Sequence, residues 1–341
     1  MSGTLAKPRA AAPADLHAAA LTLALRHAFE SPTYRPPTLP AAAMELMQLA
    51  SGSDVPFGEV VKVLDRDPVL AARVLSIAQS PVYASRSPVL SLQQAAVRLG
   101  LKGVRDLALE AALHAKVFRV PGYDDVMARL YRHSTATAHV MRATCKRFRV
   151  KFDYAFLAGL LHDVGFAAEL LALVSTPEWR GAPFQLIAPV LDAVHTDASG
   201  QLAMRWRLPA PLQELLANHH RLEVGGEVFP ANAALVVAEQ LCWEAGAGML
   251  PPPPEADADS GSTPEQPSSG FDANGPDVLE AARSLLGIDD EAMGEARREA
   301  FPEQRDRRHG QEAAPVRARR DHALLARRSA GLDTDGDAME R

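Results

Sequence analysis

The pattern of hydrophobic and polar positions along this chain is typical of a protein built from helices. Apolar residues recur at steps of three and four, Ala and Leu dominate, and the alternation typical of strands is scarce. The region between residues 41 and 80 illustrates the pattern with the stretches AAAMELMQLAS, PFGEVVKVLDRD and PVLAARVLSIAQS. We therefore expect an all-α fold.

Two positions in this region predict where helices begin and end. Pro68 suits the first position of a helix, and Asp67 directly before it suits the N-cap. Gly100 closes the stretch SLQQAAVRLG and is expected to end a helix. A second helix is expected to follow at once, over LKGVRDLALEAALHAKVF.

The helical segments fall into two groups, with other material at both ends. We expect the main domain over residues 37–245, with one helical group over 37–120 and a second over 124–245. Residues 1–36 are expected to form a helical or flexible N-terminal extension. Three segments are expected to follow the main domain: a disordered Pro/Ser-rich insert over 251–277, a helix over 278–301 and a flexible charged tail over 302–341.

Composition and charge indicate a folded protein and argue against some classes of partner. With 47% hydrophobic residues in 341, the chain can bury one large core or two modest ones. The net charge of −6 argues against a protein designed to bind nucleic acid or an anionic membrane, although the tail contains a locally basic stretch that acidic residues follow. Cys145 and Cys242, the two cysteines, are expected to be buried free thiols. We expect a cytoplasmic protein without a membrane partner.

The stretch FLAGLLHDVGF, residues 156–166, combines an apolar helix with two polar side chains. His162 and Asp163 stand side by side in it, and a glycine follows two positions later. Burying this pair is costly unless a metal ion or a hydrogen-bond partner satisfies it. The sequence leaves two alternatives open: the pair binds a metal, or His162 hydrogen-bonds Asp163 or a backbone carbonyl as a polar link in the core.

Other histidines stand at marked places in the second helical group. They are His133 in LYRHSTATA, His195 in LDAVHTDASG, and the adjacent His219 and His220 in ANHHRLE. Imidazoles with a carboxylate are the ligand set expected for Fe, Mn, Zn or Ni. Any one of these histidines alone is more often structural, so the hypothesis of a metal site depends on their number.

The chain resembles the HDOD domain, the HD-related output domain of bacterial signalling proteins, over residues 37–245. The resemblance rests on these segments, in order: LPAAAMELMQLAS, DPVLAARVLSIAQSPVY, SLQQAAVRLGLKGVRDLAL, RHS, FLAGLLHDVG, the W-x-LP step and HH. One small departure is Gln79–Ser80, where the family commonly has Asn-Ser. The resemblance implies an all-α, two-lobed helical bundle whose second lobe is of the HD type.

The resemblance also implies a ligand set, because HDOD domains are related to the metal-dependent HD phosphohydrolases. Carried over to this chain, one metal would lie between His133, His162 and Asp163. A second would lie between His195 and the pair at 219–220, with Asp163 bridging. The final aspartate of the related enzymes corresponds to the step at Ala238–Glu239, where Glu239 can still bind a divalent ion.

Two departures from the related phosphodiesterases argue against hydrolysis. Those enzymes continue HD-x-G with a lysine placed for the substrate phosphate, and Phe166 stands at that position here. The Gly-Tyr-Pro signature is also missing after the His-His pair, where this chain reads HHRLEVGGEVFPAN. No catalytic residue is therefore assigned.

Two functions follow from the resemblance. The first is a regulatory adaptor that binds other signalling proteins, such as those with receiver, GGDEF or EAL domains, and that keeps a vestigial or structural metal site. The second is a metal-dependent phosphohydrolase acting on a nucleotide or cyclic dinucleotide. A nucleotide bound at the metal site without turnover is compatible with the first, and nucleic acid is not expected as a partner.

Overall fold

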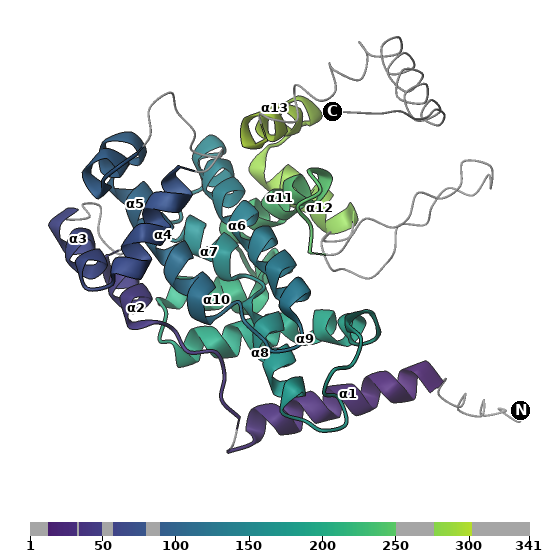
Figure 1. Cartoon of the computed structure of the whole chain (residues 1–341). Helices are drawn as coiled ribbons and strands as arrows, with labels where there is room; N and C mark the ends of the chain where they lie inside the picture. Colours follow the sequence, from purple (N-terminus) through teal and green to yellow (C-terminus); the bar gives the residue numbers. More distant parts are fainter. Residues whose placement is uncertain (1–12, 33, 50–56, 80–88, 250–275, 302–341) are drawn as a thin grey trace, which may run out of the picture.

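The computed structural model describes residues 13–32, 34–49, 57–79, 89–249 and 276–301, and nearly all of its regular structure is helical (Figure 1). This confirms the all-α prediction. The helices of the first half are α1 (Pro13–Glu30), α2 (Ala41–Gln48), α3 (Phe57–Asp65), α4 (Pro68–Ala78), α5 (Leu92–Lys116) and α6 (Asp124–Arg147). The second half contains α7 (Ala155–Leu161), α8 (Val164–Val174), α9 (Phe184–Arg205), α10 (Ala210–Asn218), β1 (Glu223–Val224), β2 (Glu227–Val228), α11 (Pro230–Glu244), α12 (Pro276–Leu286) and α13 (Asp290–Ala300).

The helices pack in two lobes, as the resemblance implies. Helices α2, α3 and α4 pack on α5 and form the first lobe. In the second lobe α7 and α11 pack on α6, while α8 and α10 pack on α9. Helix α5 reaches α7, so the two lobes are in direct contact (Figure 1).

The predicted helix ends of the first lobe are confirmed. The side chain of Asp67 accepts a hydrogen bond from the Leu70 amide at 2.9 Å, with Pro68 in the first turn of α4. Gly100 has φ 73° and ψ 166°, outside the helical region, so α5 consists of two helical segments that meet there. Glycine suits this position because other residues rarely adopt a positive φ.

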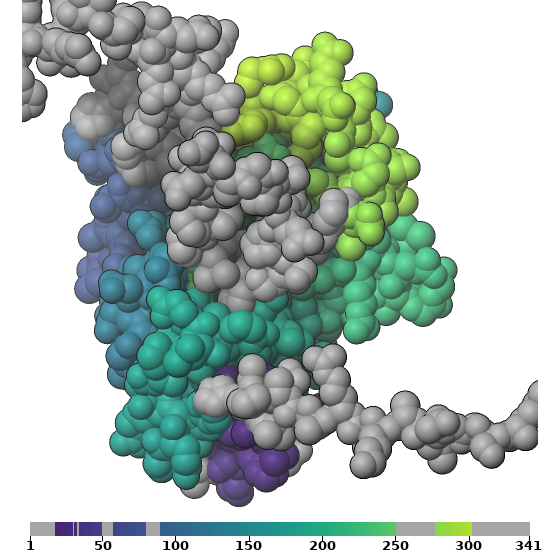
Figure 2. Space-filling view, turned by 90° about the vertical axis from the view of Figure 1, so that its right-hand side faces the viewer, coloured from purple at the N-terminus to yellow at the C-terminus, as the bar shows by residue number. Residues whose placement is uncertain are grey.

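The N-terminal extension contributes a helix to the second lobe. Helix α1 packs on α8 and α9, and its Leu21 and Leu25 side chains are buried. The following chain is fixed by two long-range hydrogen bonds, from the Tyr34 hydroxyl to the Ala168 carbonyl and from the Trp206 indole to the Pro37 carbonyl. In Figure 2, α1 in purple lies at the opposite end of the molecule from α12 and α13 in yellow-green.

The prediction of one C-terminal helix over 278–301 is wrong in one respect, because the segment forms two helices. Helix α12 ends at Leu286, Gly287 has φ 66°, and the Asp289 side chain caps α13 by accepting from the Ala292 amide at 2.8 Å. The glycine and the capping aspartate together end one helix and start the next. Most of the predicted insert and all of the predicted tail lie outside the described residues.

The prediction of one continuous helix over residues 156–166 is also wrong. Helix α7 ends at Leu161 and α8 begins at Val164, so His162 and Asp163 lie at the junction of two helices. Asp163 has φ −96° and ψ 12°, a conformation that breaks the helix. At a junction, both side chains can project to one side of the chain.

The segment from α7 through α8 is the most apolar part of the described chain. Residues Ala155–Val174 have a mean hydropathy of 1.7, enough for a candidate membrane span by length and composition alone. Within the fold 89% of the segment is buried, with α7 packed on α6 and α8 on α9. The contacts inside the protein account for its apolar character.

Candidate metal centre

The structure brings all seven predicted ligands together between the helices of the second lobe. Their side chains come from α6, the α7–α8 junction, α9, the turn after α10, and α11: His133, His162, Asp163, His195, His219, His220 and Glu239. Within three overlapping triplets of these residues, one ligand atom from each side chain lies within 4.8 Å of the others. Helices far apart in the sequence therefore form a single cluster.

The Asp163 carboxylate lies at the middle of the cluster and faces both halves. Its Oδ2 atom is 3.1 Å from His162 Nε2 and 3.4 Å from His133 Nε2. Its Oδ1 atom is 3.4 Å from His195 Nε2 and 3.6 Å from His219 Nε2. Each oxygen thus serves a different pair of imidazoles, which is the arrangement of a carboxylate that bridges two metal ions.

The first half of the cluster is completed by Glu239 from α11. Its Oε1 atom lies 3.3 Å from His162 Nε2, and the Nε2 atoms of His133 and His162 are 3.1 Å apart. Glu239 also forms a triplet with Asp163 and His219. The Glu239 carboxylate therefore reaches the cluster, as the carry-over of the family's final aspartate to this step predicts.

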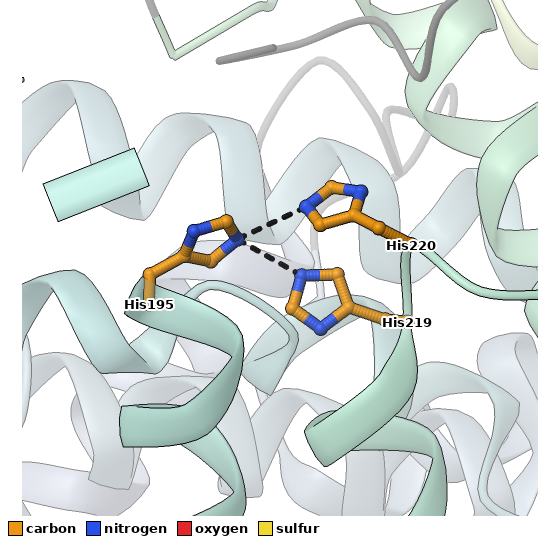
Figure 3. Close-up of side chains that lie close together, drawn as sticks. All are labelled: His195, His219 and His220. Carbon is orange, nitrogen blue, oxygen red and sulfur yellow. Dashed lines mark hydrogen bonds between the residues drawn. The ribbon is translucent and has the colours of Figure 1, made fainter. Parts of the chain in front are cut away.

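The second half of the cluster consists of three imidazoles (Figure 3). His195 Nε2 lies 3.1 Å from the Nε2 atoms of both His219 and His220. His219 and His220 are adjacent in the sequence, and in the close-up both rings point toward His195 from across the site. The three nitrogen atoms therefore face a common point.

Backbone carbonyls fix the protonation of four of these rings. In each ring the Nδ1 atom lies within hydrogen-bond distance of a backbone carbonyl oxygen. The pairs are His133 with Ala247 at 3.0 Å, His162 with Gly159 at 2.9 Å, His195 with Asp192 at 2.6 Å and His219 with Leu216 at 2.9 Å. A carbonyl oxygen only accepts, so Nδ1 must donate, and in the neutral ring Nε2 then carries a lone pair. When these rings are neutral, the Nε2 contacts of His133 with His162 and of His195 with His219, both at 3.1 Å, are therefore contacts between two acceptors unless a cation or a proton lies between them.

Such a donor set fits a divalent transition metal. Metal-binding imidazoles commonly donate their second N–H to a carbonyl, which orients the ring and fixes its tautomer. Nitrogen ligands with carboxylate oxygens suit Fe, Mn, Zn or Ni. The polar core link left open by the sequence accounts for His162 beside Asp163 and Glu239, but it does not account for the facing Nε2 atoms of His195 and His219.

The contacts within the cluster favour a positively charged His162 next to negatively charged Asp163 and Glu239. Burial alone would lower the pKa of His162, but the Asp163 carboxylate, together with Glu239, raises it well above its usual value. Burial alone would raise the pKa of both carboxyl groups, but contacts with His162 hold each pKa below its ordinary range. Burial also lowers the pKa of His219, which favours its neutral, metal-binding form.

Two glycines allow the helices to approach closely enough to form the cluster. A Cβ atom on Gly165 would lie 2.1 Å from the His195 carbonyl oxygen, and one on Gly159 would lie 2.6 Å from the Thr137 carbonyl oxygen. Ser199 adds a link, because its hydroxyl accepts from the Gly165 amide and donates to the His162 carbonyl, at 2.9 and 2.7 Å. The glycine of the HD-x-G motif therefore has a packing role.

Asn232 holds the turn that carries the His-His pair, and sequence reasoning missed it. Its side-chain amide donates to the carbonyl oxygens of Asn218 and Arg221, both at 2.8 Å. These residues flank the pair on either side. A buried asparagine near the start of a helix is common, so no signal in a single sequence distinguishes this one.

Phe166 stands at the sequence position where the resemblance implies a lysine in the related phosphodiesterases. Its ring is 1% exposed and stacks on His195 with centroids 4.5 Å apart and planes 11° apart. The Phe166 ring therefore packs against His195, one of the seven predicted metal ligands. Phenylalanine offers no charge to a phosphate group at this position.

The cluster is deeply buried. His133, His162, Asp163, His195, His219 and Glu239 are each at most 3% exposed, while His220 is only partly buried. His220 is therefore the member of the cluster with the most contact with solvent.

Comparison with known proteins identifies the family of this chain. The model of the HDOD domain matches residues 37–222, which include six of the seven ligands, while Glu239 lies beyond the match. An uncharacterized protein of Treponema pallidum (strain Nichols) is 23% identical over 205 residues, which are 57% of this chain and 39% of that protein. The chain thus matches well under half of that relative's length.

Solved structures share the helical architecture. A candidate metal-dependent phosphohydrolase of Shewanella amazonensis SB2B is similar with a TM-score of 0.59 and 17% identity, covering 84% of this chain and 97% of its own. An HDOD domain protein of unknown function from Geobacter sulfurreducens has a TM-score of 0.53 and 22% identity, covering 83% and 98%. A candidate signal transduction protein of Marinobacter aquaeolei VT8 has a TM-score of 0.55 and 23% identity, covering 84% and 64%. At these identities the likeness establishes the fold alone.

Proposed function

The chain belongs to the HDOD family, and from this premise we propose that it is a signal-transduction protein whose second lobe binds two divalent transition-metal ions. In this proposal the metal centre stabilises and organises the lobe, and the protein acts by binding other signalling proteins. The observation that carries the metal part is the set of four Nε2 atoms, each on a ring whose Nδ1 is bonded to a carbonyl, and two carboxylates that face one another.

In this proposal the ligands are divided between two ions. His133, His162 and Glu239 with Oδ2 of Asp163 would hold one ion, and the three histidines of Figure 3 with Oδ1 of Asp163 would hold the other. Bound metal would supply positive charge where the apoprotein has facing lone pairs. A divalent ion of this kind can also act as a Lewis acid toward a phosphate group.

Two features support a regulatory role over hydrolysis. Phe166 is packed against His195 and supplies no charge for a phosphate, and six of the seven ligands are at most 3% exposed. A phosphodiester substrate needs direct access to the metals and cationic groups around the transferred phosphoryl group. The described residues provide little of either.

Exposed apolar residues around the start of α5 support the protein-binding part of the proposal. On the first lobe Leu90, Val97 and Leu101 are 71%, 90% and 36% exposed. Leu90 lies just before α5, Val97 lies in its first segment, and Leu101 follows the break at Gly100, so the three are close in sequence. Exposed apolar surface of this kind is typical of protein contacts. Receiver, GGDEF or EAL domain proteins are the partner classes that we propose.

The alternative is a metal-dependent phosphohydrolase acting on a nucleotide or cyclic dinucleotide. The completeness of the ligand set, including Glu239, is the observation that favours it. A structural site needs fewer ligands than a two-metal centre that leaves positions for water and substrate.

Turnover assays on the metal-loaded protein separate the two functions. We expect no hydrolysis of bis(p-nitrophenyl) phosphate, cyclic di-GMP or common nucleotides above the background of a His162→Ala variant. Turnover of any of these substrates that the His162→Ala substitution abolishes would overturn the regulatory proposal and establish the enzyme.

A further inference from the structure

A cavity of about 530 Å³ lies where the end of α5 meets the start of α6. His114 from α5 lines it, together with five residues of α6: Asp125, Ala128, Arg129, Tyr131 and Arg132. None of the seven predicted metal ligands is among these residues. The volume is in the range of sites that hold small molecules.

Arg129 carries a positive charge for which the described part of the chain supplies no counter-ion. The residue is half-buried, and its Nε atom has no hydrogen-bond partner among the described residues. Its guanidinium carbon lies 5.9 Å from the centroid of the Phe184 ring, a contact that holds the group without neutralising it. Asp125 precedes it by one helical turn, but within the described residues the two form no ion pair. A half-buried cation of this kind is costly unless a ligand brings negative charge.

Three further arginines add positive charge around the cavity. Arg132 lines it and is exposed. Arg73 from α4 and Arg119 from the connection between α5 and α6 are near enough to His114 to lower its pKa, although burial lowers that pKa more and Glu110 opposes the effect. The arginines come from three separate segments, so the fold gathers them at this place. Their summed charge attracts anions to the cavity.

We propose that this cavity binds a small molecule that carries a phosphate monoester. Arg129 and Arg132 are three residues apart on α6 and are therefore neighbours on one face of the helix. Their planar guanidinium groups would hold the phosphate oxygens through paired hydrogen bonds. A phosphate group alone fills only a small part of the cavity, so the rest of the molecule would lie against the rings of His114 and Tyr131, whose centroids are 4.0 Å apart.

The position of the cavity suits a ligand with a regulatory effect. His114 belongs to the first lobe, while Arg129 and Arg132 belong to the second. A bound molecule would therefore contact both lobes. Asp125 is the carboxylate in the lining, and it is exposed, so solvent and salt screen its repulsion of an anion. An uncharged or cationic ligand would leave Arg129 without a counter-ion.

Isothermal titration calorimetry with phenyl phosphate and benzoate tests the proposal on the full-length, metal-loaded protein. Both molecules carry one aromatic ring, and they differ in the anionic group. We expect phenyl phosphate to bind at least about tenfold more tightly, because a dianion gains more from several arginines than a single carboxylate does. Equal affinities would overturn the proposal, as would an absence of phenyl phosphate binding.

Variants assign the binding to the cavity. Arg132→Glu reverses a charge at an exposed position and should weaken phenyl phosphate by at least about tenfold. Arg129→Lys keeps the charge but removes the planar fork, and it should also weaken binding. Arg298→Glu is the matched control, because Arg298 is likewise exposed on a helix, α13, and it should bind as the parent does. Circular dichroism verifies that each variant is folded, and unchanged binding in Arg132→Glu would overturn the proposal.

Binding of phenyl phosphate at the metal centre is the competing outcome. If chelation of the metals abolishes binding while Arg132→Glu retains it, the phosphate binds the metals and the cavity proposal is wrong. If Arg132→Glu loses binding while the chelated protein retains it, the cavity is the site. The result holds whether or not the metal centre has the role proposed above.

A phosphorylated side chain of another protein carries the same chemical group. A phosphoserine peptide of mixed sequence, titrated in the same way, distinguishes this source from a small molecule. We expect it to bind no more tightly than phenyl phosphate. A peptide that binds at least about tenfold more tightly would overturn the assignment to a small molecule.

Discussion

The two oxygens of Asp163 face different pairs of imidazoles, Oδ2 toward His133 and His162 and Oδ1 toward His195 and His219. No other residue of the cluster has this position. The loss of a ligand from the edge of the site affects one ion, but the loss of this carboxylate affects both. The family resemblance predicts a bridging role for Asp163, and whether it bridges two ions stays a prediction.

Asp163→Asn should therefore remove both metal ions together. The amide offers one neutral oxygen in place of two charged ones, so neither ion keeps its carboxylate ligand. Elemental analysis of the variant after dialysis should find nearly none of the parent's metal content, since even the loss of a residue that supports a ligand lowers metal affinity by roughly 10–100-fold. Asp197→Asn, an exposed change nearby on α9, is the control and should keep the full content.

Gly165→Ala should destabilise the protein because there is no space for a methyl group. Its Cβ would lie 2.1 Å from the His195 carbonyl oxygen and 2.9 Å from the Ser199 amide nitrogen, both of them backbone atoms. We expect a loss of about 3 kcal/mol in the free energy of unfolding, measured by chemical denaturation. Gly58→Ala, where a Cβ meets nothing within 4 Å, should be neutral or slightly stabilising. Equal stabilities of the two variants would contradict the packing role.

Glu169 is a buried carboxyl group that the proposed functions do not use. It is 0% exposed, and neither of its oxygens has a hydrogen-bond partner within the part of the chain that the structure describes. Burial raises its pKa well above the ordinary value, and the nearby Asp192, Asp163 and Asp197 raise it further. The folded protein therefore keeps this proton at pH values where the unfolded chain has lost it.

The stability difference between Glu169→Gln and the parent should depend on pH. Because the folded state binds the proton more tightly, the parent loses stability as the pH rises from about 4.5 toward the raised pKa. The variant lacks this loss, so its advantage should grow by up to about 1.4 kcal/mol for each pH unit in that window. Chemical denaturation at pH 5, 6, 7 and 8 measures it. A constant difference across this range would show that Glu169 is already ionised in the fold.

At the scale of helices, the junction between α7 and α8 determines the geometry of the site. The sequence predicted the apolar character of residues 156–166 but placed the HD pair inside one helix. The helix instead ends at Leu161 and a new one begins at Val164, so both polar side chains can turn from the apolar helices toward the same cluster. Helical periodicity alone does not reveal such a break, because the residues on both sides of it are apolar and helix-forming.

The turn after α10 depends on α11 through Asn232. Asn232→Ala would leave the carbonyls of Asn218 and Arg221 without their donor, at a cost of about 1–3 kcal/mol. The His-His pair between these residues would then be less well positioned. We expect faster release of one of the two ions to a chelator, measured by stopped-flow absorbance.

A matched variant on the same helix provides the control for Asn232. Gln240→Ala removes a side-chain hydrogen bond to Glu244 within α11, away from the His-His turn. It should release both ions at the parent rate. Equal acceleration in the two variants would mean that general destabilisation of α11 is the cause.

At the scale of the whole molecule, the two lobes are joined by buried charged groups. The Tyr131 hydroxyl on α6 donates to Glu110 on α5 at 2.8 Å, and Arg142 on α6 pairs with Asp106 on α5 at 2.8 Å. Glu110 and Asp106 are almost fully buried. Directional contacts of this kind define one relative placement of the lobes, which suits a protein that presents a fixed surface to partners.

The sequence predicted the helical class, the two groups of helices, the ends at Asp67 and Gly100, and two buried free cysteines, all of which the structure confirms. Its seven candidate ligands converge, and whether they bind metal stays a prediction. It did not predict the docking of α1 on α8 and α9, because amphipathic pattern shows that a face is buried but not what covers it. Nor did it predict the hairpin of β1 and β2, whose turn at Gly225 and Gly226 uses positive φ angles.

Metal content of the purified protein is the most direct test of the central claim, which is that five imidazoles and two carboxylates form a two-metal centre. Inductively coupled plasma mass spectrometry, after growth with added iron, manganese, zinc and nickel, gives the ions per chain. The account predicts about two transition-metal ions per chain in the parent and nearly none in Asp163→Asn. A parent protein that is folded, holds no stoichiometric metal and takes none up on reconstitution would contradict it.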